Sequence, residues 1–88
     1  MIIISRRGDL GPADALDLRE ELDDATQQAD PNVMLDLRDV DSMHPAVVAA
    51  IVRAARQARR AAGGLELRRP TSPAASRMLG LVAIDQLI

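Results

Sequence analysis

The residues of this chain best suited to chemistry lie together in the stretch VDSMHPAVVAAIV, which contains its only histidine, His44. A histidine acting as a general base needs a nucleophile within hydrogen-bond reach and a further group that orients its ring. Ser42 and Asp41 are near in sequence, but neighbouring positions of an extended strand point in different directions. The stretch therefore predicts no catalytic residue, and it favours His44 as a cap in front of a helix that begins with Pro45.

Carboxylates are the second candidate chemistry, because Asp36, Asp39 and Asp41 lie close together in the sequence. Alternation places Asp36 on the strand face opposite Leu35 and Leu37, and we expect the other two aspartates in the loop that follows. We interpret all of them as solvated or capping carboxylates. A lone histidine with scattered aspartates and no cysteine has no metal-ligand spacing, so no metal or cofactor is expected.

A third candidate is the basic stripe on an expected second helix, formed by Arg53, Arg56, Arg59 and Arg60. The stripe could neutralise phosphates or an acidic partner, pair with the acidic segment over residues 14–24, or be solvated. The sequence leaves these alternatives open. Nucleic acid is not expected as a partner, because the formal net charge is −2 and no aromatic residue is present on which bases could stack.

Short strands and helices that alternate along the chain would position these residues. The apolar run Ile2–Ile4 predicts a buried strand, which the segment from Gly8 to Pro12 would end. The apolar tail Leu81–Ile88 is expected to pack back on the domain. The remaining expected elements are a helix from Pro12 to a stop at Asp30–Asn32, a strand over Val33–Leu37, a helix from Pro45 to a stop at Gly63-Gly64 and a strand over Leu65–Arg68. A third helix is expected to start within Pro70–Pro73, with Thr71 or Ser72 as its cap and Pro73 near the first turn, and to run to about Leu79.

This alternation predicts an α/β fold of βαβαβα order with a mostly parallel sheet and helices mainly on one face. The chain has 88 residues, of which 48% are hydrophobic and 27% charged, and this composition fits one small globular domain over residues 1–88 with an aliphatic core. It shows no signal peptide and no apolar run of membrane-spanning length. The expected location is therefore the cytoplasm, without membrane insertion.

Several segments, in this order, resemble the STAS domain, the fold of bacterial anti-sigma factor antagonists. VMLDL (33–37) matches the family's central hhLDL strand, and GGLEL (63–67) looks like its GGxLhL segment. GDL (8–10) resembles its G-E-L-D turn, and SPA (72–74) resembles the start of its closing SPxVxxhLxxxGL segment. The resemblance implies that the family's first strand and last helix are missing here. Such a loss would open a sheet edge through which a homodimer could form.

In the family, a D-S-S-G sequence begins the second helix, and in phosphorylated members its first serine is the switch. Phosphate at this serine adds about two negative charges to the interface and releases the partner. Pro45 takes that position here and cannot accept phosphate, while a competing alignment, shifted by three residues, would make Ser42 the phosphoacceptor. Counted from Asp36, the motif's positions fall on His44, Pro45, Ala46 and Val47.

The resemblance implies a non-enzymatic interaction module similar to an anti-sigma factor antagonist, in bacterial signalling and transcription regulation. It would bind an anti-sigma kinase-like protein without serine phosphorylation at Pro45. We expect Val47 or Val48 to be exposed as a small apolar patch near the start of the helix. The expected partner surface comprises Ser42, Met43, His44, Pro45, Ala46, Val47 and Val48, with Arg53 at its rim.

The resemblance and the residues also allow two other functions. In one, the domain is a cytosolic STAS accessory subunit of a lipid-transport ABC system, which binds the transporter's ATPase and needs no phosphoacceptor. In the other, it binds a small molecule, and the backbone amides at the start of the second helix form an anion site. Pro45 weakens the second alternative, because proline removes one of the amide donors.

Overall fold

The computed structural model describes residues 1–27, 32–60 and 63–80. In these residues the strands form a three-stranded parallel sheet in the order β1-β2-β3, and the βαβαβα order predicted from the sequence is confirmed. The elements are β1 (Ile2–Leu10), α1 (Pro12–Thr26), β2 (Asn32–Met43), α2 (Pro45–Arg60), β3 (Gly64–Arg68) and α3 (Pro73–Gly80).

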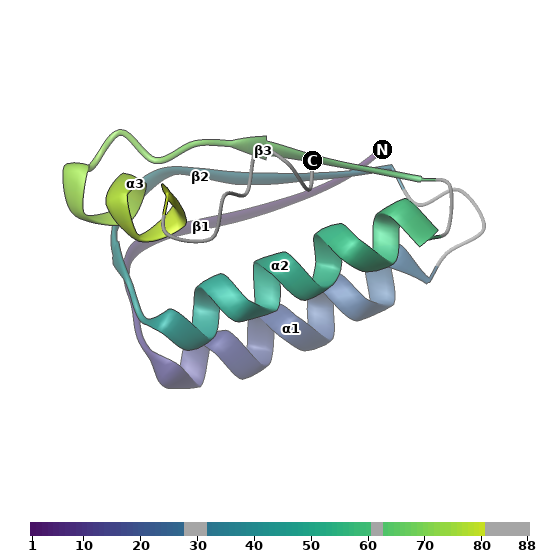
Figure 1. Ribbon diagram of the computed structural model, residues 1–88, viewed down its shortest axis with the longest axis horizontal. Helices are drawn as coiled ribbons and strands as arrows, with labels where there is room; N and C mark the ends of the chain where they lie inside the picture. Colours follow the sequence, from purple (N-terminus) through teal and green to yellow (C-terminus); the bar gives the residue numbers. More distant parts are fainter. Residues whose placement is uncertain (28–31, 61–62, 81–88) are drawn as a thin grey trace.

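The described helices all cover the same face of the sheet, which confirms the one-sided arrangement expected from the alternating strands (Figure 1). α1 and α2 lie side by side along the sheet, and α3 lies near the start of α2, where the strands end. The core between these layers is aliphatic. Its largest fully buried side chains are Leu18, Leu22, Leu35, Leu37, Ile51, Leu79, Val33, Val40 and Val47.

Local sequence signals fix the ends of the helices. Pro12, Pro45 and Pro73 are each the first residue of a helix, where the missing N–H of proline has no intrahelical partner to lose. After α2, the N–H of Gly63 donates to the carbonyl of Ala58 at 3.0 Å. This bond across five residues is typical of a Schellman motif and confirms the predicted helix stop.

The first strand differs from its prediction in length and in burial. It does not end at Gly8 but continues to Leu10, because Gly8 adopts a φ of +76° that other residues rarely take. Register shifts on both sides of this region keep β1 paired with β2. Only Ile4 of the apolar run is in the core, whereas Ile3 is 64% exposed on the open face of the sheet, because successive strand residues point to opposite faces.

The central strand is also longer than predicted. β2 continues through Met43, so Asp39 and Asp41 lie in the strand and not in a loop after it. The reason is pairing: β2 is hydrogen-bonded to β1 as far as the pair Leu10 and Met43. The extended strand carries the chain directly to His44 and the start of α2.

β1 forms one edge of the sheet, because in the described part of the chain it pairs with β2 alone. Its register shifts interrupt the regular row of backbone groups that a second strand would need. A homodimer through this edge stays a prediction. Residues 81–88, expected to pack on the domain, lie outside the described residues. Among the helices that are described, none combines the length and the apolar character needed to cross a membrane.

Candidate functional site

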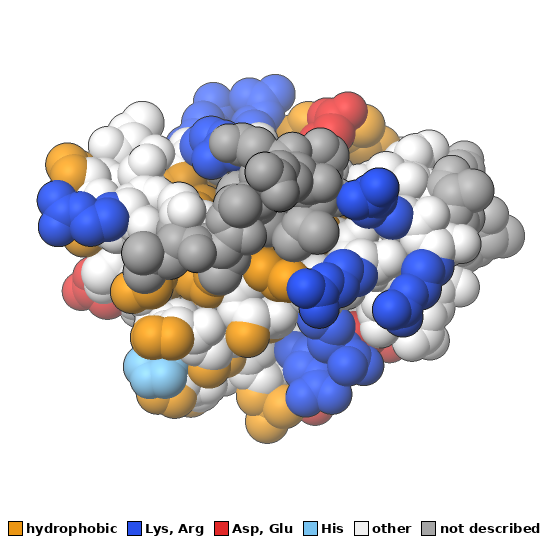
Figure 2. Space-filling model, in the orientation of Figure 1, with side chains coloured by type: hydrophobic (Ala, Val, Ile, Leu, Met, Phe, Trp, Pro, Cys, Tyr) orange, Lys and Arg blue, Asp and Glu red, His pale blue; other side chains and the backbone are white. Residues whose placement is uncertain are grey.

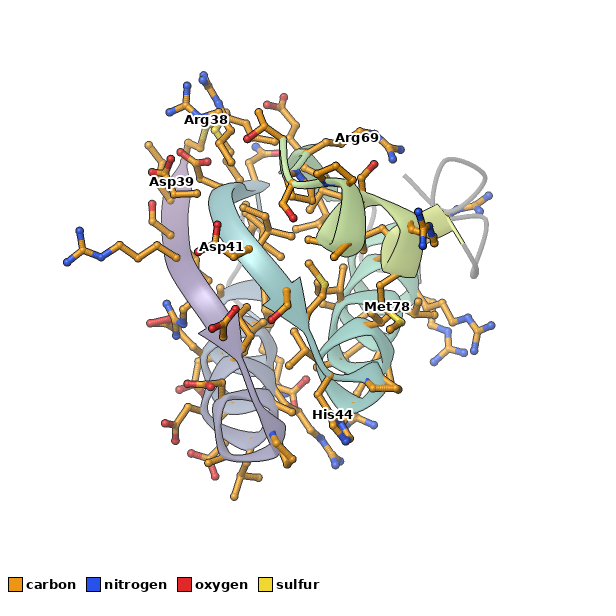
Figure 3. The ribbon with its side chains drawn as sticks, turned by 90° about the vertical axis from the view of Figure 1, so that its left-hand side faces the viewer. Arg38, Asp39, Asp41, His44, Arg69 and Met78 are labelled. Carbon is orange, nitrogen blue, oxygen red and sulfur yellow. The ribbon has the colours of Figure 1, made fainter. Side chains whose placement is uncertain are left out.

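His44 lies between β2 and α2, at the end of the sheet that faces the viewer in Figure 3. Its N–H donates to the carbonyl of Leu10 at 2.8 Å, which fixes the junction to the end of β1. Its carbonyl accepts from the N–H groups of Val47 (2.9 Å) and Val48 (3.4 Å), and its Nδ1 accepts from the N–H of Ala46 at 3.0 Å. His44 is therefore the N-cap residue of α2, as the sequence predicts.

Replacing His44 with alanine removes the acceptor for the N–H of Ala46. We expect the free energy of unfolding to fall by about 1 kcal/mol, which is typical for the loss of an N-cap side chain. Urea denaturation followed by circular dichroism measures this loss. His44→Asn places a well-suited cap acceptor at the same position and should keep most of the stability. Equal losses in both variants would contradict the capping role.

Ser42 and His44 do not form a nucleophile–base pair in the described structure. The hydroxyl of Ser42 donates to Oδ1 of Asp9 at 2.7 Å, across to β1, while the ring Nδ1 of His44 accepts the capping bond. The carbonyl of Asp41 accepts from the hydroxyl of Ser72 at 2.6 Å, which ties the segment before α3 to β2. A phosphate on Ser42 would lie beside the Asp9 carboxylate, and the two negative charges would repel each other.

Three members of the expected partner surface are buried: Met43, Val47 and Val48 are 5%, 0% and 3% exposed. The expectation that Val47 or Val48 is exposed is therefore wrong. α2 packs against α1, the sheet and α3 together, so more than one side of the helix is covered. The members that remain accessible are the exposed His44, Pro45 and Arg53 and the half-buried Ser42 and Ala46.

Asp36 is ion-paired, which the interpretation as a solvated or capping carboxylate missed. It accepts from Nε (3.1 Å) and Nη2 (3.0 Å) of Arg38 and from the Arg38 backbone N–H (3.1 Å). The side-chain bonds from Arg38 are the main reason why the pKa of the Asp36 carboxyl lies below its usual value. In Figure 3, Asp39 and Asp41 follow along β2, away from His44. Among the described residues, no cluster of potential metal-ligating side chains is present.

The lowered pKa of the Asp36 carboxyl determines how its contribution to stability changes with pH. Its contribution to stability is present above the ordinary carboxyl pKa, about 3.9, and is lost as the pH falls through the lowered value. An NMR titration should place the midpoint of the Asp36 carboxyl below that of an ordinary aspartate. Arg38→Gln should move the midpoint upward, whereas Arg56→Gln, on α2, should not. An unchanged midpoint in Arg38→Gln would contradict the assignment.

The basic stripe of α2 pairs in part with α1. Nε of Arg53 lies 3.4 Å from Oδ1 of Asp23, so for this arginine the structure shows pairing with the acidic first helix, one of the alternatives that the sequence leaves open. Such an exposed pair contributes at most about 1 kcal/mol. Arg56 and Arg60 are exposed on the same helix. Figure 2 shows arginine side chains gathered along the course of α2, beyond the histidine and the hydrophobic side chains around it.

A groove of about 400 Å³ opens between the first turns of α1 and α2. Sequence reasoning missed this groove. The sequence feature that could have indicated it is the series of small residues near the start of α2. The groove exists, however, only because α1 packs beside these residues. The lining residues are Pro12, Ala15, Leu16 and Arg19 of α1 and Ala46, Ala49, Ala50 and Arg53 of α2.

The chain matches the model of a known protein family. A protein-family model with the description "Mlab, STAS domain" matches residues 2–88, which includes every described element from β1 to α3. No curated protein matches the chain closely enough to count as a relative. The match thus agrees with the resemblance carried by the strand and loop motifs, and it includes the start of α2.

Proposed function

The chain belongs to the STAS domain family, whose members are in general non-enzymatic binding modules, and we propose that it is a protein-interaction module that binds its partner at the start of α2. We propose further that serine phosphorylation at this position does not control binding. The observation that carries this proposal is Pro45, which is exposed and follows the capping His44. The resemblance to the family implies that Pro45 takes the position of the phosphoserine.

The proposed partner surface is smaller than the sequence suggests. It consists of the accessible residues Ser42, His44, Pro45, Ala46 and Arg53. The buried Met43, Val47 and Val48 support this surface from beneath. Because His44 is bonded to Leu10 and to the first turn of α2, the backbone of the surface is fixed before any partner binds. Such preorganisation reduces the entropy lost on binding.

We propose the ATPase of a lipid-transport ABC system as the partner, which would place the domain in the cytoplasm. STAS subunits of such systems need no phosphoacceptor, and Pro45 provides none. The description of the matching family model names Mlab and not an anti-sigma factor antagonist. An anti-sigma kinase-like protein, with a role in transcription regulation, is the second candidate. It is favoured by the location of the accessible surface at the position of the D-S-S-G motif.

Binding experiments with purified proteins distinguish the two partners. The chain should be tested against the ABC ATPases and the anti-sigma kinase-like proteins of its own genome, by isothermal titration calorimetry. We expect one ATPase to bind, and Pro45→Arg to weaken binding at least roughly tenfold, or about 1.4 kcal/mol. Ala13→Arg is the matched control, because Ala13 is an exposed residue in the first turn of another proline-initiated helix. Equal binding by Pro45→Arg, or binding by neither class, would overturn the proposal.

Mass spectrometry tests the independence from phosphorylation. The chain is incubated with ATP and with an anti-sigma kinase-like protein that binds it. We expect the intact mass of the chain to stay unchanged. Pro45→Ser restores an acceptor at the family's position and is the positive control, with an increase of about 80 Da for one phosphate group. An increase in the wild-type protein that maps to Ser42 would support the competing alignment instead.

A further inference from the structure

We infer that the groove between the first turns of α1 and α2 binds an acidic helical segment of the partner, with an aliphatic side chain in the groove and a carboxylate against Arg19 and Arg53. The inference rests on the proposed function, because Ala46 belongs both to the partner surface and to the wall of the groove. A partner bound at the start of α2 would therefore reach the groove.

The groove results from small residues at the start of α2. Further along the two helices, side chains close the seam: Arg53 pairs with Asp23 at 3.4 Å, and the hydroxyl of Thr26 bonds to Gln57 at 3.1 Å. Towards the helix starts, α2 contributes only the methyl groups of alanines to the seam. A groove of about 400 Å³ lies at this part of the seam. The lining alanines of α2 are Ala46, Ala49 and Ala50.

Apart from Arg19, the opposite wall of the groove is apolar. Leu16 of α1 is 59% exposed and is one of the few large hydrophobic residues on the described surface. Pro12 and Ala15 continue this wall towards the start of α1. A single exposed leucine needs no explanation. A leucine beside an unfilled apolar groove, however, provides contacts for one or two aliphatic side chains.

Charge decides which segment fits. Both ionisable side chains that line the groove are arginines, Arg19 and Arg53. Arg53 is ion-paired with Asp23 through the Nε atom of the arginine. Arg19 is exposed and forms no ion pair within the described part of the chain. A guanidinium group binds a carboxylate with charge-assisted hydrogen bonds. The complementary segment therefore carries a glutamate or aspartate near its aliphatic residue.

NMR titration of the ¹⁵N-labelled chain tests the groove directly. The probe is a synthetic amphipathic peptide of about 20 residues, longer than the roughly 12–15 residues below which isolated helices are marginal in water, with leucines on one face and glutamates beside them. A peptide with lysines in place of the glutamates, and sodium decanoate, are the comparison probes. We expect the glutamate peptide to shift the amide signals of Ala46, Ala49 and Ala50. Stronger binding by the lysine peptide, or binding by decanoate alone, would overturn the inference.

Two pairs of variants separate groove binding from general effects. Ala49→Leu fills the groove from an exposed helix position and should abolish the shifts, whereas Ala13→Leu, outside the groove, should not. Arg19→Glu should weaken binding of the glutamate peptide at least roughly tenfold. Arg56→Glu makes the same charge change away from the groove and should have a smaller effect. Equal binding by Ala49→Leu and wild type would contradict the inference.

The same variants distinguish a failure of this inference from a failure of the proposed function. If the ATPase binds wild type and Ala49→Leu equally but does not bind Pro45→Arg, the groove is not used in binding, and the proposed partner surface is supported. If the ATPase binds neither Ala49→Leu nor Pro45→Arg, both the proposed partner surface and the proposed groove site are supported. If no partner of either class binds the wild-type chain, the proposed function fails, and the inference that depends on it fails too.

Discussion

Replacing Val47 with arginine is expected to unfold the domain. Val47 is 0% exposed and lies in the core cluster at the first turn of α2. A guanidinium group placed there loses its hydration without gaining a partner, and the effective penalty is several kcal/mol. Native proteins have a total stability of only about 5–15 kcal/mol. Circular dichroism should show loss of helix, and thermal scans should show no cooperative transition.

Ala49→Arg is the matched control for this prediction. Ala49 lies two residues further along α2 but is exposed. The free energy of unfolding of this variant should therefore lie within about 0.5 kcal/mol of the wild-type value. The comparison also matters for binding experiments. A loss of partner binding by Val47→Arg would report unfolding and could not locate a partner surface. A folded Val47→Arg protein with wild-type stability would contradict the orientation of α2 in the structure.

Leu35→Ala has the second largest expected effect. Leu35 is 0% exposed and lies in β2, the central strand of the sheet, between Ile4 of β1 and Leu67 of β3. Truncation removes buried methyl groups and leaves a cavity in a core that contains no aromatic residue to move into it. We expect a loss of about 2–5 kcal/mol in the free energy of unfolding, measured by urea denaturation.

Ile3→Ala tests whether this loss depends on burial. Ile3 is a strand residue one position from Ile4, but it is 64% exposed on the open face of the sheet. Its truncation should change the free energy of unfolding by less than about 0.5 kcal/mol. Similar losses for Leu35→Ala and Ile3→Ala would mean that the open face is covered in solution, for example by a partner chain.

Part of the candidate site could be predicted from residues alone. The start of α2 at Pro45 and the capping position of His44 follow from local chemistry, since a proline at the first helical position and an acceptor before it act within one turn. That Pro45 cannot accept phosphate is equally local, because it is a matter of residue type. The burial of both Val47 and Val48 could not be predicted in this way, because it depends on which elements surround the helix.

The sequence by itself determined the order of the elements, the helix starts at Pro12, Pro45 and Pro73, and the buried face of Val33, Leu35 and Leu37, because periodicity, proline and glycine act over a few residues. The tertiary structure decided the rest. Pairing with β1 extended β2 to Met43, and packing on several sides buried more of α2 than one face. The groove arose only where two helices, distant in sequence, came to lie side by side. These features depend on contacts between segments, which no local pattern specifies.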